Sequence, residues 1–169
     1  ATVGGSNTDT TYSGNLPVGA NPILASFTDT DDGLSLFGSA AGSNVDDEFF
    51  TGIDLSMTLA NSSATDTYEV VVRISYDQDV DSDGADAYAE SAFTVDEPGP
   101  VEVFFSEILS DTVYGDQKDG VLLGTFGALV EDMGIDFLTI NLAPGASTTL
   151  AGALTLEGGV FLDPGSAGG

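Results

Sequence analysis

Carboxylates at every second position dominate one segment of this chain. From Asp79 the sequence reads D-V-D-S-D-G-A-D-A-Y-A-E, so Asp79, Asp81 and Asp83 occupy positions one, three and five. Gly84 is at position six and Glu90 at position twelve, which fits the calcium-loop pattern D-x-[DN]-x-[DN]-G-x5-E. In such a coiled loop alternate residues point inward, the Gly permits a sharp turn, and the final Glu supplies two oxygens. The spacing therefore predicts a calcium site.

Three further residues extend the predicted ligand set. The Ala85 carbonyl can supply an oxygen, and Asp77 or Asp86 can replace one of the named ligands. A β-branched stretch precedes the segment where a helix–loop–helix hand would have a helix, so we expect a calcium loop on a β scaffold. The alternative is a solvated acidic turn, because 28 Asp and Glu in 169 residues produce carboxylate clusters by chance.

Period-two alternation predicts the strands that must position this segment. Apolar residues alternate with polar ones from Tyr68 to Tyr76 and again over residues 49–60, and we expect these two strands to form an antiparallel hairpin. Further short strands are expected at residues 22–29, 34–37, 88–95, 101–105, 135–142 and 150–156, a last one at residues 160–162, and one or two helical turns at residues 104–114.

About nine short strands with regular turn signals predict an all-β, single-domain β-sandwich or jelly roll. Residues 1–22 are expected to form an extended N-terminal arm, residues 23–162 the sandwich, and residues 163–169 a Gly-rich tail. The apolar positions of the arm are Val3, Tyr12 and Leu16.

Charge and composition exclude several function classes. The net charge is −26, with Arg73 and Lys118 as the only cations, so neither a nucleic acid nor an anionic membrane surface is an expected partner. Self-repulsion on this scale favours a protein that works in high salt or with divalent cations. The chain has no Cys and no His, so Ser–His and Cys–His catalysis is impossible and we expect no enzyme. A start at Ala1 without Met favours a processed, secreted chain.

Two smaller features carry expectations of their own. Asn61-Ser62-Ser63 is a glycosylation sequon in a loop that we expect to be exposed. Asp116 and Asp119 flank Lys118 and are expected to screen its charge.

Two short motifs resemble the camelysin/TasA-like secreted fibre subunits. One is Phe27-Thr28-Asp29-Thr30-Asp31, similar to F-x-D-x-[DE], and the other is Phe50-Thr51-Gly52-Ile53-Asp54-Leu55, similar to F-x-x-G-x-L-D-L with one residue fewer. The resemblance covers residues 23–60. It implies a jelly-roll subunit that polymerises outside the cell into biofilm or surface filaments, with an N-terminal strand of one subunit completing the sheet of its neighbour.

The sequence thus supports two hypotheses of different classes. The first is a secreted acidic subunit that assembles with copies of itself into filaments, with residues 1–16 as the donor arm and calcium or salt as the stabilising cofactor. The second is a calcium-dependent carbohydrate-binding or adhesin module of the cell surface, whose partner is a surface polysaccharide.

Overall fold

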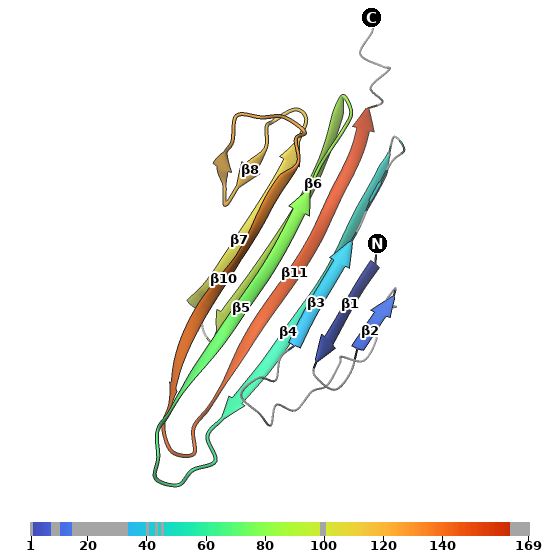
Figure 1. Cartoon of the computed structure of the whole chain (residues 1–169). Helices are drawn as coiled ribbons and strands as arrows, with labels where there is room; N and C mark the ends of the chain where they lie inside the picture. The colour runs from blue at the N-terminus through green and yellow to red at the C-terminus, as the bar shows by residue number, and fades with distance from the viewer. Residues whose placement is uncertain are drawn as a thin grey trace, which may run out of the picture.

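The computed structural model describes residues 2–7, 11–14, 34–39, 41–42, 44, 46–98 and 101–162. Eleven strands, β1 to β11, occupy most of these residues, and no helix occurs among them (Figure 1). It follows that the described residues include no helix that is long and apolar enough to cross a membrane. The predicted all-β fold is therefore confirmed.

The larger sheet has six antiparallel strands in the order β4-β11-β6-β7-β8-β9. Their bounds are Asp47–Ala60 (β4), Ser147–Leu162 (β11), Asp86–Glu97 (β6), Val101–Asp111 (β7), Gln117–Lys118 (β8) and Val121–Leu122 (β9). Strands β4, β11, β6 and β7 are long and lie side by side along the molecule (Figure 1).

Two smaller sheets accompany the large one. β5 (Tyr68–Val80) and β10 (Val130–Leu142) pair antiparallel along their whole length, from Tyr68 opposite Leu142 to Val80 opposite Val130. The third sheet has the order β2-β1-β3, with β1 at Thr2–Asn7, β2 at Thr11–Gly14 and β3 at Leu34–Ser39.

The hydrophobic core lies between the β5–β10 pair and the six-stranded sheet. Ile74, Ile140 and Leu142 of the pair pack against Val95, Phe104 and Leu150 of the large sheet. The Phe104 ring also contacts Tyr76 from the opposite layer, with 4.9 Å between ring centroids. Inward positions on facing strands thus interdigitate, as in a β-sandwich, and the sandwich prediction is confirmed, while its jelly-roll form stays a prediction.

Two predictions about individual elements are wrong. Residues 49–60 form β4 as expected, but β4 pairs with β11 and the following strand pairs with β10, so the two do not form a hairpin. Alternation predicts a strand but not its partner. Residues 101–111 form strand β7, with no helical turn at 104–111. Ser106 and Ser110 occupy buried positions of β7, and these small polar residues conceal the strand period.

Candidate functional site

The predicted calcium ligands are spread over two strands and the connection between them. Asp77 and Asp79 lie exposed on β5, on the face that points away from the core. Asp79 lies directly opposite a second carboxylate, Glu131 of β10. The next members of the set lie in the connection of residues 81–85 and at the first position of β6: Asp81, Asp83, Ala85 and Asp86.

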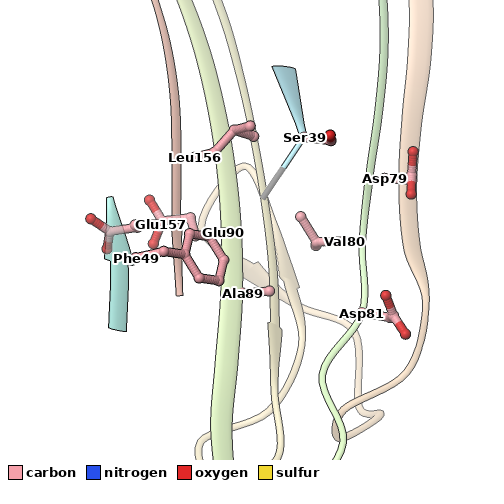
Figure 2. A pocket seen from close by; sticks show the side chains of 9 residues that line it. All are labelled: Ser39, Phe49, Asp79, Val80, Asp81, Ala89, Glu90, Leu156 and Glu157. Carbon is pink, nitrogen blue, oxygen red and sulfur yellow. The ribbon is translucent and has the colours of Figure 1, made fainter. Parts of the chain in front are cut away.

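Glu90 lies in the middle of β6, within the six-stranded sheet. It stands directly opposite Glu157 of β11, where like charges repel across the strands. Burial raises the pKa of the Glu90 carboxyl, and the negative charges of Glu157 and Glu107 raise it further. In Figure 2, Glu90 and Glu157 lie on one side of a cavity, and Asp79 and Asp81 lie on the other.

These positions do not form one calcium shell. Among the residues with described positions, no three carboxylates lie close enough together to hold a metal ion. The reason is the backbone form: positions one and twelve belong to extended strands of different sheets, where side chains alternate between faces. A coiled loop would turn the same side chains toward one point. Calcium binding stays a prediction.

The cavity of Figure 2 lies between the ends of two strands. It has a volume of about 170 Å³, with Ser39 of β3, Asp79 and Val80 of β5 and Asp81 directly after β5 at its sides, and Ala89 and Leu156 of the six-stranded sheet in its lining. Within the described residues, β3 pairs only with β1, and β5 pairs only with β10. Among the residues whose positions are described, one edge of each strand has no strand partner, and Figure 1 shows β11 in the interval between them. We call this space between β5 and β3 the strand slot.

The apolar face of β4 is only partly covered by the sandwich. Every second residue of β4 is partly buried, from Phe49 through Ile53 and Leu55 to Leu59, and the residues between them are exposed. Leu154 and Leu156 on the neighbouring strand β11 are also only partly buried. Burial of apolar surface contributes roughly 25 cal/mol per Å². A further strand laid over this face would therefore stabilise the sandwich.

The predicted donor arm is partly described. Val3 belongs to β1 and Tyr12 to β2, and β1 pairs with both β2 and β3 of the same chain. Leu16 lies outside the described residues. The arm thus contains strand-forming segments whose backbone adds to a sheet edge.

A buried chain of polar side chains connects the two main layers. Ser91 on β6 donates to Gln78 Oε1 on β5 at 2.9 Å, and Gln78 Nε2 donates to Ser106 Oγ on β7 at 3.0 Å. Ser106 in turn donates to Asp132 Oδ2 on β10 at 2.7 Å. No buried side-chain N or O atom in the described part of the chain lacks a hydrogen-bond partner. The sequence signal for this hydrogen-bonded network is Gln78, a polar residue at an inward position of an otherwise apolar alternation.

Lys118 lies at the solvent-exposed end of this hydrogen-bonded network. Its Nζ donates to Asp132 Oδ1 at 2.6 Å, and the side chain of Asp132 is only 8% exposed. Burial raises the pKa of Asp132, but hydrogen bonds from Lys118 and Ser106 outweigh it and hold that pKa below its usual value. The ion-pair partner of Lys118 is therefore Asp132, and the expectation that Asp116 screens it is wrong.

Asp116 instead organises the connection between β7 and β10. Its carboxylate is fully buried, with Oδ1 accepting from the N–H groups of Asp111 (2.9 Å) and Gly127 (2.8 Å), and Oδ2 from that of Ala128 (3.0 Å). Burial raises the pKa of Asp116, but hydrogen bonds from the Thr125 side chain and these backbone groups outweigh it, so the pKa lies below its usual value. One carboxylate thus fixes both ends of the connection.

Asn61 is buried, contrary to the exposed position that we expected for the sequon. Its residue is 4% exposed, and its Nδ2 donates to the carbonyls of Asp66, Leu142 and Ala143. Its Oδ1 accepts from the N–H of Ser63. The side chain thus closes the loop after β4, and a glycan on Nδ2 would displace these bonds.

Comparison with protein-family models, with curated proteins and with solved structures gave no match to this chain.

Proposed function

We propose that this protein is a secreted, acidic structural subunit that assembles with copies of itself into extracellular filaments. In this proposal the N-terminal segment of one subunit enters the strand slot of the next. The observation that carries the proposal is the slot itself, where two strand edges that have no partner within the described part of the chain flank a cavity beside a partly buried apolar face. We assign the protein a structural role and no catalytic one.

An extended segment in the slot would satisfy two physical needs together. Its backbone would pair with the edges of β5 and β3 that face the slot, to which no other described strand is bonded. Its alternate side chains would cover the partly buried residues of β4 and β11. Both gains come from one added strand.

The donor in this proposal is residues 1–16. Its segment β1 already adds to the edge of β3 within the chain, and β2 adds to β1, so the same backbone is competent for strand addition. Donation replaces the β1–β3 bonds within one chain by backbone bonds to the slot of the next chain, which offset their loss. A head-to-tail exchange continues from subunit to subunit and produces a filament.

Deletion of residues 1–16 tests the donor. The truncated protein should remain folded by circular dichroism but form no filaments in electron micrographs. It keeps a slot, so it should also stop the growth of wild-type filaments when added in substoichiometric amounts. Filaments of the truncated protein would overturn the proposal, and dispersed full-length particles with affinity for a polysaccharide would favour the carbohydrate-binding adhesin.

A synthetic peptide of residues 1–16 tests the acceptor. It should bind the truncated protein with one peptide per chain and raise its melting temperature, because a ligand that binds only the folded state stabilises it. A peptide with the same composition in scrambled order is the control. Equal effects of both peptides would exclude a defined slot.

Cations enter the proposal through the net charge of −26. Copies of so acidic a chain repel one another until salt or calcium screens them. Both should therefore promote assembly, and calcium should raise the melting temperature. If the acidic segment binds calcium specifically, Asp81→Ala and Glu90→Ala should abolish the calcium response. Unchanged responses of both variants would indicate diffuse screening.

A further inference from the structure

The connection between β7 and β10, residues 112–129, exposes a dense set of large apolar side chains. Its members are between 42% and 78% exposed: Val113, Tyr114, Val121, Leu122, Leu123, Phe126 and Leu129. Leu122 and Phe126 approach the same glycine, Gly115, and a Cβ there would lie 3.4 Å from each side chain. The connection lies at one end of the molecule beside β8 (Figure 1), and its exposed apolar side chains are here called the apolar cap.

The apolar cap is held rigidly in its exposed form. The Asp116 carboxylate joins Asp111, before the connection, to Gly127 and Ala128 near its end. The Asp116 backbone adds bonds to Thr125 O (2.9 Å) and from Leu123 N (2.9 Å). Left-handed turns occur at Gly115, Asp119, Gly120, Gly124 and Gly127. A loosely held loop of this composition could fold onto the core, whereas this one keeps its side chains outward in a preorganised surface.

Charge decides which partner the apolar cap fits. Residues 112–129 contain three charged groups, of which Asp116 is buried and Lys118 is paired, so Asp119 is the one exposed carboxylate of the connection, and it accepts a hydrogen bond from Glu107 N. In a chain with a net charge of −26, two copies can approach here with less repulsion than at acidic faces. An anionic lipid surface, in contrast, would repel the rest of the chain.

The exposed area of the cap suits a protein interface. An aromatic side chain buries roughly 150–250 Å² in an interface, and the cap exposes Tyr114 and Phe126 together with five aliphatic side chains. A monomer rarely exposes an apolar patch of more than a few hundred Å² without a function. A standard interface buries about 800 Å² on each partner.

We propose that the apolar cap is a self-association surface, on which a second copy of the chain docks through its own cap. Two identical patches can meet about a two-fold axis, because such an interface is self-complementary. This contact is separate from the strand slot and does not depend on strand exchange. High salt strengthens it, because the Debye length falls to roughly 3 Å at 1 M.

Site-specific cross-linking of the full-length chain tests the proposal. The sequence has no Cys, so Leu123→Cys introduces a single thiol into the cap. The matched control is Phe137→Cys on the outer face of β10, where the native side chain is 61% exposed. Under mild oxidation in 2 M NaCl, the cap thiol should form covalent dimers at least about tenfold faster than the control. The rate of dimer formation is compared between two thiol positions in the same chain, so filaments formed by strand exchange do not account for a difference between them.

A second substitution tests whether the apolar surface itself causes the contact. Phe126→Ser removes a side chain that is 63% exposed, and Phe137→Ser removes one that is 61% exposed elsewhere. In the Leu123→Cys background, Phe126→Ser should slow dimer formation at least about tenfold, and Phe137→Ser should leave it unchanged. Melting curves confirm that both variants fold. Equal cross-linking at positions 123 and 137, or no effect of Phe126→Ser, would overturn the proposal.

Discussion

Two regions of this molecule use their carboxylates in opposite ways. Residues 77–90 carry many carboxylates at regular spacing, yet they lie on two strands and a connection and do not converge on one point. The connection of residues 112–129 has one buried carboxylate, Asp116, and it fixes the whole segment. The difference lies in the donors: Asp116 receives three backbone N–H groups and a side-chain bond from Thr125, whereas Glu90 faces Glu157.

The comparison teaches that the spacing of acidic residues does not establish a site without the backbone form that orients them. A carboxylate becomes structural where hydrogen-bond donors converge on it. It stays a source of repulsion where another carboxylate occupies the opposite position of a strand pair. The substitutions below test this contrast, beginning with the largest expected effect.

Asp116→Ala should cause the largest loss of stability. It removes a buried acceptor and leaves the N–H groups of Asp111, Gly127 and Ala128 without their partner. We expect a loss of about 3–5 kcal/mol in the free energy of unfolding, measured by urea denaturation. Limited proteolysis should also cut the variant within residues 112–129 faster than the wild type.

Asp83→Ala is the matched control from the acidic segment, because Asp83 is exposed in the connection of residues 81–85. Its effect should stay within about 0.5 kcal/mol in the absence of calcium. A loss as large as that of Asp116→Ala would break the contrast between the two regions.

Asp132→Asn should cause an intermediate loss of about 1–3 kcal/mol at pH 7, because its partner Lys118 is 39% exposed and solvent screens part of the attraction. The folded pKa values of Asp116 and Asp132 are lowered. Their stabilisation is therefore fully present above the unfolded pKa of about 3.9 and is lost as pH falls through the lower folded values. Melting temperatures between pH 2 and pH 7 should decline on the acid side, and less steeply in the variant. An unchanged acid decline would show that Asp132 contributes no pH dependence.

Glu90→Gln should produce the smallest effect, and with the opposite sign. The folded pKa of Glu90 is raised, so its ionisation costs stability, and this cost grows as pH rises from the unfolded pKa of about 4.3 through the folded value. The variant should gain about 0.5–1 kcal/mol at pH 7 in low salt, and little below pH 4. Molar salt should reduce the gain. A loss of stability at pH 7 would indicate that Glu90 is paired with a cation.

Sequence reasoning predicted the elements better than their partners. The alternation of residues 49–60 and of Tyr68 to Tyr76 identified β4 and β5, because one face of each strand meets the core. It could not show that the connection after β4 crosses to the other sheet, since pairing depends on contacts far apart in the chain. The hairpin prediction failed for this reason.

The candidate sites were harder to predict. The strand slot depends on which edges stay free, and no local pattern reports that. Asp116 and Asp132 look like any other acids in a chain of 28 Asp and Glu, and their burial follows from the packing of β7, β8 and β10. The inward Gln78 was the available signal for the buried network, because it continues the alternation of β5, whereas Ser106 gave none, because small polar residues conceal the period of β7.

The buried amide of Gln78 has a consequence for how the two layers align. It accepts from Ser91 and donates to Ser106, so it contacts two strands of the large sheet at once. A purely apolar interior would tolerate a sliding of one layer by a residue pair, since one aliphatic side chain can replace another. Here such a shift would leave a buried donor and a buried acceptor without hydrogen-bond partners. The hydrogen bonds of the Gln78 amide therefore favour one alignment of the two layers.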